Sequence, residues 1–256
     1  MVWEPDAYPP FHTQASVAFG DLVRLIRVRA GLQVLHVGCG TGSVTSRLAV
    51  LLPESDILGI DSSPHVLALA TQRTRPGLRF ALQAIADTTG EWDLVVSSGV
   101  LHTLDEHHKS LMSRLLALVR PGGQLVVEFP SDQNTEFDAI LRGIATEGQF
   151  RFALDGGWIH QSWILRLEQY AVLLYDHGGT DLTVYEKVYP MLLEHAAMLV
   201  DERVGTALAL YLERLPETLA EPFIERYRAA VRDRYGAGPL FYPLRRIVLA
   251  ATRALP

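Results

Sequence analysis

The feature that most constrains the fold is an alternation, through the first half of the chain, of short β-branched segments with helical segments. Five segments are predicted as strands: Gln33–Val37, Asp56–Ile60, Leu78–Leu82, Asp93–Ser97 and Gln124–Phe129. Strands that alternate with helices predict a parallel sheet with helices on both faces. We therefore expect an α/β fold, and sheets of this kind bind ligands at the carboxyl ends of their strands.

The helices between these strands have recognisable ends. Ser63 is placed to cap a helix that begins at Pro64, where the missing N–H costs nothing. Another helix is predicted over Asp105–Val119, because its leucines recur at helical spacing. Pro121-Gly122-Gly123 then turns the chain into the next strand. These ends separate the predicted strands at the spacing that an α/β sheet requires.

The pattern changes after Phe129. Helices are predicted over Phe137–Ala145, Trp163–Tyr175, Leu192–Leu215 and Pro216–Tyr235, the last ended by Gly236. Strand-like segments lie at Asp181–Tyr189 and Leu240–Ala251, of which the second can supply a last antiparallel strand. We expect one domain over residues 1–256. Its sheet core is expected at about 20–133, 181–190 and 240–253, and its helical cap at about 134–178 and 191–236.

Composition narrows the functional classes. A chain of 256 residues that is 48% apolar and 20% charged can bury a full core. The net charge of −6, without a dense Lys/Arg run, predicts no nucleic-acid partner. The N-terminus lacks a signal-peptide pattern and no apolar segment approaches the ~18 residues of a bilayer span, so we expect a cytoplasmic protein without a membrane partner. The single cysteine, Cys39, closes no internal disulfide, and no metal site is expected.

The strongest motif is a buried strand that runs into a glycine-rich turn, Val37-Gly38-Cys39-Gly40-Thr41-Gly42. Its glycines let the backbone come close to a ligand. The dinucleotide fingerprint Gly-x-Gly-x-x-Gly would need a glycine where Ser43 stands, which disfavours NAD and FAD. Asp61 ends the second strand, where α/β nucleotide sites place a carboxylate for the ribose hydroxyls. The alternative role of Asp61 is to help cap the helix at Pro64.

The Gly-x-Gly-x-Gly turn followed about twenty residues later by Asp61 resembles the class I S-adenosylmethionine-dependent methyltransferases. Further segments narrow the resemblance to the trans-aconitate 2-methyltransferase family: Trp3-Glu4-Pro5-Asp6, Gly59-Ile60-Asp61-Ser62-Ser63-Pro64, Leu101-His102-x-Leu104, Pro121-Gly122-Gly123, Gly205-Thr206-Ala207-Leu208 and Pro243-Leu244-Arg245-Arg246. The resemblance implies a Rossmann-like sheet, mostly parallel with an antiparallel last strand, and a helical cap over the acceptor pocket. It also implies S-adenosyl-L-methionine as the cofactor and S-adenosyl-L-homocysteine as its product.

The resemblance also implies a set of cofactor-binding residues at the strand ends and in the N-terminal segment: Gln14, His36, Gly38, Cys39, Gly40, Gly42, Asp61, Ser62, Ala84, Ile85, Ser97 and Ser98. Asp61 would hold the ribose hydroxyls, and Ala84 and Ile85 would flank the adenine. Two positions depart from the family. His36 stands where an acidic residue is usual, and Ala84 stands where an aspartate commonly meets the adenine amine, a role that Asp87 either takes over or leaves vacant.

The acceptor side departs further from the family. Two positions where the family carries arginine read Ala15 and Ala209, so a tricarboxylate would lose counter-ions. We therefore expect a small-molecule acceptor less charged than trans-aconitate. Arg245 and Arg246 can enter the pocket from another side, but we expect them on a strand edge, facing water.

The candidate catalytic residue is His102, which follows the fourth strand and can act as a general base for a hydroxyl, a phenol or an acidic carbon. A hydrogen-bonded loop histidine is an equal alternative, and a carboxylate nucleophile would need no base. His107-His108 is expected as a solvated helix start rather than a pair of metal ligands. One aromatic cluster is expected in the cap, either as packing or as a pocket wall: Trp158, His160, Trp163 and Tyr170.

The sequence thus predicts a methyltransferase that uses S-adenosyl-L-methionine and acts as a monomer or homodimer. Two alternatives remain open at this point. One is an NAD-dependent reductase, which Ser43 disfavours. The other is a non-catalytic protein that holds S-adenosylmethionine or S-adenosylhomocysteine. Transfer of tritium from labelled cofactor to a metabolite would separate the three.

Overall fold

The computed structural model describes residues 9–104, 106–131, 135–204 and 207–256, without the side chains of residues 9–16 and 202. The chain divides into two units by its internal contacts. The sheet unit spans Val17–Ser131, Trp163–Lys187 and Arg246–Pro256. The helical unit spans Met1–Ser16, Asp132–Ser162 and Val188–Arg245.

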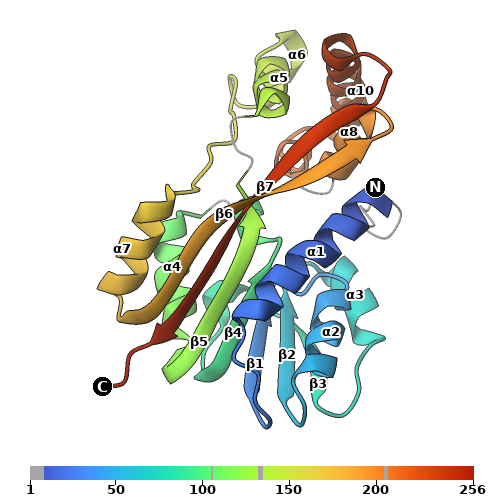
Figure 1. The fold of residues 1–256 in the computed structure, drawn as a ribbon. Helices are drawn as coiled ribbons and strands as arrows, with labels where there is room; N and C mark the ends of the chain where they lie inside the picture. Colours follow the sequence, from blue (N-terminus) through green and yellow to red (C-terminus); the bar gives the residue numbers. More distant parts are fainter. Residues whose placement is uncertain (1–8, 105, 132–134, 205–206) are drawn as a thin grey trace. The chain divides into compact units, whose positions relative to one another are not determined.

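Seven strands form one sheet: β1 (Gln33–Val37), β2 (Asp56–Asp61), β3 (Leu78–Leu82), β4 (Trp92–Ser98), β5 (Val119–Pro130), β6 (Gly179–Leu193) and β7 (Leu240–Arg253) (Figure 1). Their order across the sheet is β3-β2-β1-β4-β5-β7-β6. Strands β1 to β5 pair in parallel, whereas β7 is antiparallel to β5. The Ala254 N–H donates to the Gly178 carbonyl at 2.8 Å, so the start of β6 lies beside the end of β7. The predicted sheet, mostly parallel with an antiparallel last strand, is confirmed.

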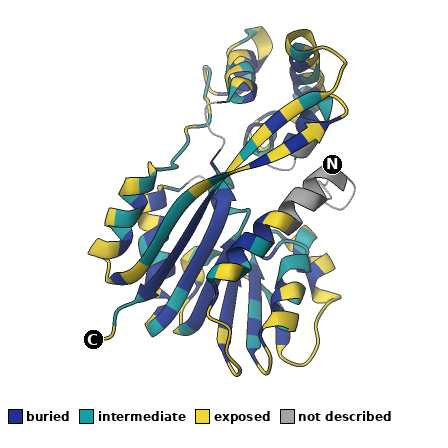
Figure 2. Cartoon of the chain, in the orientation of Figure 1, coloured by how far each residue is buried: buried dark blue, intermediate teal, exposed yellow. Residues whose placement is uncertain are grey.

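Helices cover both faces of this sheet: α1 (Pro9–Leu25), α2 (Ser43–Leu51), α3 (Pro64–Thr71), α4 (His108–Ala117) and α7 (Leu167–Asp176). Consecutive residues of a strand point to opposite faces. Val34 accordingly joins the core with residues of α1 and α2, and Leu35 joins the core with residues of α4 and α7. The central strands are buried along most of their length (Figure 2), which explains why their sequences are continuously apolar.

The helical unit contains α5 (Glu136–Ala145), α6 (Gly148–Ala153), α8 (Ala197–Val204), α9 (Ala209–Leu212) and α10 (Glu217–Tyr235). Its core holds an aromatic group in which Phe223 contacts Phe150 and Tyr211, with ring centroids 5.0 and 5.7 Å apart. Asp138 completes a capping box with Thr135 at the start of α5, and its carboxylate pairs with the buried Arg203 guanidinium at 2.6 Å. This ion pair ties α5 to α8.

Two predicted elements differ in kind from the structure. The helix predicted over Asp105–Val119 differs in its bounds, because α4 ends at Ala117 and Val119 already begins β5. The segment Leu192–Leu215, predicted as one helix, ends β6 and then forms α8 and α9. Its first residues alternate between buried and exposed, as in a strand, with Met191 and Leu193 buried and Leu192 exposed. The second difference is Pro121-Gly122-Gly123, which lies inside β5 at a register shift against β4 rather than in a turn before the strand.

The division into a sheet core and a helical cap stays a prediction. The sequence predicts residues 163–178 as part of the cap, but Trp163 and α7 belong to the sheet unit. Helix α7 begins at Leu167 rather than at Trp163. Its Tyr170 and Leu174 are buried in the same core as the central strands.

Candidate functional site

A glycine-rich turn joins β1 to α2 and is fastened to the end of β2. The N–H groups of Gly38 and Cys39 both donate to the Ile60 carbonyl at 2.9 Å, and the Gly42 N–H donates to the Cys39 carbonyl at 2.9 Å. Gly38, Gly40 and Gly42 have φ values of 69°, 54° and 77°. Side-chain-bearing residues rarely adopt these angles. The turn therefore depends on glycine at each of the three positions.

The three glycines differ in what surrounds them. A Cβ on Gly38 would lie 2.7 Å from the Val100 Cβ, and a Cβ on Gly42 would lie 2.8 Å from the Phe80 ring. A Cβ on Gly40 would meet no atom within 4 Å. Gly38 and Gly42 are thus required by the protein's own packing, whereas the space over Gly40 is open to a ligand.

Asp61, the last residue of β2, bridges this turn and the start of α3. Its Oδ2 accepts a hydrogen bond from the Gly40 N–H at 2.9 Å, and its Oδ1 accepts one from the Ser63 N–H at 2.9 Å. Ser63 precedes α3, but its side chain makes no capping hydrogen bond. Each carboxylate oxygen has a second lone pair and can also accept from a ligand hydroxyl. Asp61 therefore serves the helix start and is equipped to hold a diol as well.

The predicted adenine side lies next to Asp61, because the Gln83 N–H donates to the Asp61 carbonyl at 2.9 Å. Ala84 and Ile85 begin a short 3-10 turn, Ile85–Asp87, after β3, and both are half-buried. Ser62 and Asp87 are exposed. The carboxyl ends of β1, β2 and β3 therefore bring together the glycine turn, the carboxylate and the predicted adenine contacts.

His36 lies in β1 with only 1% of its surface exposed. Its Nδ1 lies 2.7 Å from the Thr45 hydroxyl oxygen, and its Nε2 has no hydrogen-bond partner among the residues that the structure describes. Burial lowers the pKa of His36 to about 4. The ring is therefore neutral at pH 7 and cannot form the ion pair that a carboxylate at this position would form with an ammonium group.

Cys39 belongs to the glycine-rich turn through its backbone, and its side chain is buried in the protein. The Cys39 side chain is 5% exposed and packs against Leu67, Ala70 and Phe80. Burial is the main reason that its thiol pKa is raised to about 12. Gln14 falls within α1, but its side chain lies outside the described residues.

The two serines at the end of β4 have different partners. The buried Ser97 hydroxyl donates to the Val37 carbonyl at 3.1 Å and so links β4 to β1. The Ser98 hydroxyl donates to Glu128 Oε1 at 2.5 Å. Glu128 Oε2 accepts from Arg246 Nε, also at 2.5 Å. The Glu128 and Arg246 side chains are 2% and 11% exposed, respectively.

Arg246 is therefore not on a water-facing strand edge, and this prediction was wrong. Sequence analysis also missed Glu128. The signal was present, because Glu128 is an acidic residue within the apolar segment Leu125–Phe129, and a buried carboxylate requires a partner. Arg245, in contrast, is exposed as expected.

The histidines after β4 have separate roles. His102 is half-buried in a 3-10 turn, Leu101–Thr103, that follows the end of β4. His108 is buried: its Nε2–H donates to the Leu101 carbonyl at 3.2 Å, and its Nδ1 accepts from the Tyr170 hydroxyl at 2.5 Å. Burial lowers the pKa of His108 to about 4. The predicted solvated helix start is therefore wrong for His108. Its two hydrogen bonds connect α7 with the 3-10 turn that contains His102.

The four aromatic residues predicted as one cluster belong to two units. Tyr170 packs against Phe129, with ring centroids 5.9 Å apart, and Trp163 packs against His107 at 3.7 Å. In the helical unit, Trp158 packs against Tyr211 at 5.2 Å. The His160 N–H donates to the Tyr211 hydroxyl at 3.1 Å. Neither set is the single wall that the sequence suggested.

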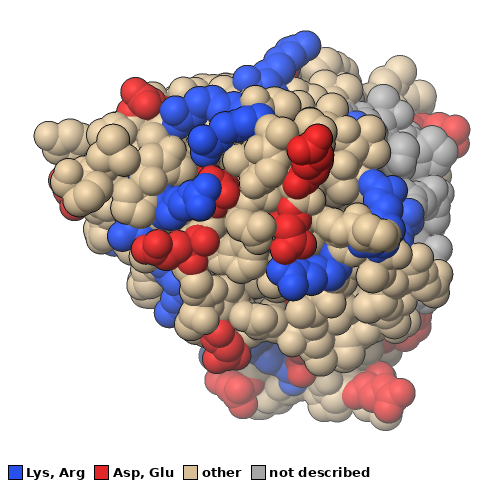
Figure 3. Space-filling model, turned by 90° about the horizontal axis from the view of Figure 1, so that it is seen from below, with Lys and Arg blue, Asp and Glu red and all other residues tan. Residues whose placement is uncertain are grey.

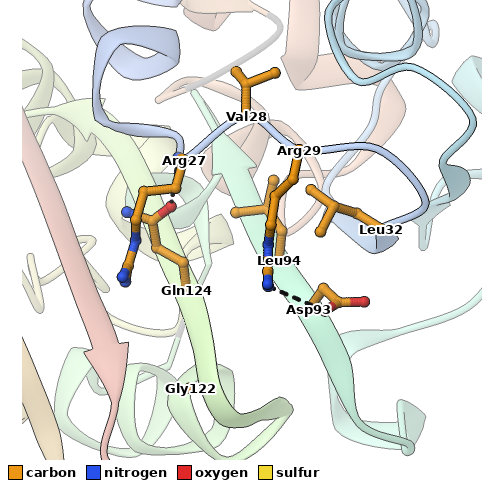
Figure 4. A pocket seen from close by; sticks show the side chains of 8 residues that line it. All are labelled: Arg27, Val28, Arg29, Leu32, Asp93, Leu94, Gly122 and Gln124. Carbon is orange, nitrogen blue, oxygen red and sulfur yellow. Dashed lines mark hydrogen bonds and ion pairs between the residues drawn. The ribbon is translucent and has the colours of Figure 1, made fainter.

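A pocket of about 270 Å³ lies at the opposite, amino edge of the sheet, lined by Arg27, Val28, Arg29, Leu32, Asp93, Leu94, Gly122 and Gln124 (Figure 4). Its buried carboxylate, Asp93, already accepts from the Gln33 N–H, Arg29 and Arg120. On this face basic and acidic side chains are interspersed (Figure 3). The carboxylate thus ties strand starts together and is not available to a substrate.

Within the described residues, no helix is long and apolar enough to cross a membrane. No group of three or more His, Cys, Asp or Glu side chains in the same part of the chain is arranged to hold a metal ion.

Comparison with known proteins gives relatives of both sequence and fold. A family model described as a methyltransferase domain matches residues 35–125. The chain is 36% identical, over 258 residues and 99% of each chain, to a trans-aconitate 2-methyltransferase of Deinococcus radiodurans. Among solved structures, the YcgJ protein of Bacillus subtilis matches with a TM-score of 0.61 at 12% identity, over 94% of this chain and 100% of that one.

A second solved structure, magnesium protoporphyrin IX methyltransferase of Synechocystis PCC 6803 with bound S-adenosylhomocysteine, matches with a TM-score of 0.55 at 18% identity. The match covers 96% of this chain and 84% of that one. At such identities the structural matches establish the fold, because one fold serves many activities. The family is established by the full-length sequence relative.

Proposed function

Because the chain belongs to the trans-aconitate 2-methyltransferase family, within the class I S-adenosylmethionine-dependent methyltransferases, we propose that it methylates a small acceptor less charged than trans-aconitate. Methyl transfer from S-adenosylmethionine follows from the family. The charge of the acceptor and the roles of individual residues are the proposed part. The observation that most supports these roles is the position of Asp61 beside the open space over Gly40.

The residues at the carboxyl ends of β1 to β3 fit the cofactor. Asp61 offers two carboxylate oxygens to the ribose hydroxyls, and the glycine turn leaves the backbone at Gly40 open to close approach. We propose that Ala84 and Ile85 flank the adenine and that Ser62 lies beside it, because all three follow the carboxyl ends of β2 and β3. Ser97 and Ser98 use their hydroxyls within the protein, so we propose that they shape the methionine subsite through the backbone at the end of β4.

When bound, S-adenosylmethionine supplies a methyl group on a positively charged sulfur. The chain's own task is to position the acceptor and exclude water, which can lower a barrier by roughly 7–11 kcal/mol. His102 is the proposed general base for a hydroxyl or carbon acceptor, because its turn directly follows β4. A carboxylate acceptor is already an anion and needs no base.

The lower acceptor charge rests on two alanines at positions where the family carries arginine. Ala15 lies in α1 with its side chain outside the described residues, and Ala209 is the first residue of α9. Neither offers the planar fork of donors with which arginine binds a carboxylate. An unpaired carboxylate loses several kcal/mol of solvation when it enters a pocket, so three carboxylates would be costly to accommodate.

A radiolabel assay tests the proposed acceptor class. Purified protein and methyl-labelled S-adenosylmethionine are incubated with trans-aconitate, its decarboxylated and esterified analogues, and small phenols. We expect a less charged compound to be methylated faster than trans-aconitate, and Asp61→Ala to transfer little label to any of them. Turnover of trans-aconitate well above all the others would show that the missing arginines do not decide the acceptor.

The remaining expectations stay predictions from the sequence. They are a cytoplasmic location, a monomer or homodimer, and the lack of nucleic-acid and membrane partners. Size-exclusion chromatography with light scattering measures the oligomeric state directly.

A further inference from the structure

A half-buried guanidinium at the carboxyl edge of the sheet has donors that the described residues leave unused. Arg246 lies opposite Pro130 in the β5–β7 register, and its side chain is 11% exposed. Its Nε donates to Glu128. Among the described residues, neither Nη1 nor Nη2 makes a hydrogen bond. Four N–H donors on one planar group are therefore left for a ligand.

Glu128 holds this guanidinium in a fixed orientation. One carboxylate oxygen accepts from Arg246 Nε and the other from the Ser98 hydroxyl, each at 2.5 Å. Because Glu128 accepts a hydrogen bond from Nε alone, the ion pair does not occupy the edge of the guanidinium formed by Nη1 and Nη2. A pre-oriented arginine loses less side-chain entropy when it binds an anion than a mobile one does.

The guanidinium lies close to the proposed methyl-transfer site. The Gly99 N–H donates to the Glu128 carbonyl at 2.9 Å. A Cβ on Gly99 would lie 3.5 Å from Arg246 Nη2, and Gly99 has a φ of 73°. The next residue, Val100, packs against Gly38 of the glycine-rich turn between β1 and α2. Glycine at position 99 thus leaves the space beside Arg246 Nη2 free of a side chain, one residue from the contact with that turn.

We propose that Arg246 binds one carboxylate of the methyl acceptor through Nη1 and Nη2 and so determines specificity. This inference rests on the proposed function. One guanidinium fork pairs with one carboxylate, which matches an acceptor less charged than trans-aconitate. The methionine carboxylate of the cofactor has the same chemistry, so the experiment must distinguish the two sources.

The informative substitution is Arg246→Lys. Lysine keeps a positive charge for Glu128, so the buried carboxylate is not stranded, but it lacks the planar fork. Arg253→Lys is the matched control, because Arg253 lies on the same strand and donates to the carbonyls of Ala117 and Val119 at the amino edge. Thermal unfolding of both variants verifies that they are folded.

The probes are cinnamate and its neutral isostere cinnamamide, titrated into protein saturated with S-adenosylhomocysteine. We expect the wild type and Arg253→Lys to bind cinnamate at least about tenfold more tightly than cinnamamide, since one charged hydrogen bond supplies that factor. Arg246→Lys should reduce this preference by about tenfold. Its affinity for S-adenosylhomocysteine should not change.

Two results would overturn the inference. One is a wild-type protein with no preference for the carboxylate. The other is an Arg246→Lys variant that keeps the preference. If that variant also binds S-adenosylhomocysteine tenfold more weakly, Arg246 holds the cofactor carboxylate instead. If Arg246→Lys does not fold, the double variant Glu128→Gln/Arg246→Met, which buries no charge, replaces it under the same criteria.

Failure of the proposed function would look different. In that case the wild type would methylate trans-aconitate well above all the other acceptors in the radiolabel assay. A carboxylate preference that persists in such a protein and falls in Arg246→Lys would still support the anion site at Arg246.

Discussion

Replacing Asp61 by alanine separates its structural role from its proposed contact with the ribose. The substitution removes acceptors from the N–H groups of Gly40 and Ser63, each at 2.9 Å. Hydrogen bonds to charged groups contribute about 1.5–3 kcal/mol each when buried. Because Asp61 is half-buried and water can replace it in part, we expect the variant to lose only about 2 kcal/mol of unfolding free energy. The variant should therefore still fold.

The affinity measurement uses S-adenosylhomocysteine and its 2′-deoxyribose analogue in isothermal titration. If Asp61 accepts from the ribose, the wild type should bind the analogue about tenfold more weakly, or about 1.4 kcal/mol. Asp61→Ala should bind both ligands weakly and about equally, because the partner of the 2′-hydroxyl is already gone. Comparing the two ligands in both proteins cancels any loosening of the turn.

Asp56→Ala is the matched control for this experiment. Asp56 lies at the other end of β2 and pairs with the exposed Arg79 at 3.0 Å. Its substitution should leave both affinities unchanged. If Asp61→Ala still binds the 2′-deoxy analogue tenfold more weakly than the parent compound, Asp61 does not hold the ribose and serves only the start of α3.

Two further predictions concern stability and the glycine turn. Burial lowers the pKa of His36 and of His108 to about 4, whereas the same histidines have a pKa near 6.5 in the unfolded chain. The unfolded state therefore binds more protons between pH 4 and 6.5, and the unfolding free energy should fall by roughly 3 kcal/mol per histidine as the pH is lowered through this range. Urea unfolding of the wild type and His36→Leu measures this, and identical pH profiles would contradict it. Gly38→Ala should be more destabilising than Gly40→Ala, because only the former brings a Cβ against Val100. Gly40→Ala should instead lose affinity for S-adenosylhomocysteine, and wild-type affinity in that variant would show that the ligand does not lie over Gly40.

The central strands were predictable because both their faces are buried. Gln33–Val37 and Leu78–Leu82 have the same bounds in the prediction and in the structure. A strand between two helical layers is continuously apolar, and the turns on either side mark its ends. The segment Leu192–Leu215 is also rich in apolar residues, but it combines the end of β6 with two short helices. Neither a period of two nor one of 3.6 describes the whole segment.

Some site residues were predictable and others were not, depending on their separation in sequence. The glycine-rich turn and Asp61 are close in sequence, so their spacing alone indicated that they meet. The pair Glu128–Arg246 joins residues 118 positions apart. It depends on the antiparallel register that sets Glu128 against Val248 and Pro130 against Arg246. A shift of one residue would turn Arg246 to the other face of the sheet, and local patterns do not determine that register.

The environment of Cys39 makes this residue a chemical reporter. It is the single cysteine in the sequence, and its thiol is packed under the glycine-rich turn against α3, where burial raises its pKa to about 12. Alkylating reagents attack the thiolate, so labelling requires local opening of the turn. The rate of labelling therefore measures how often the turn opens, averaged over all molecules, without a fluorophore or a substitution. Ligands that close the turn will slow the reaction in proportion to their occupancy.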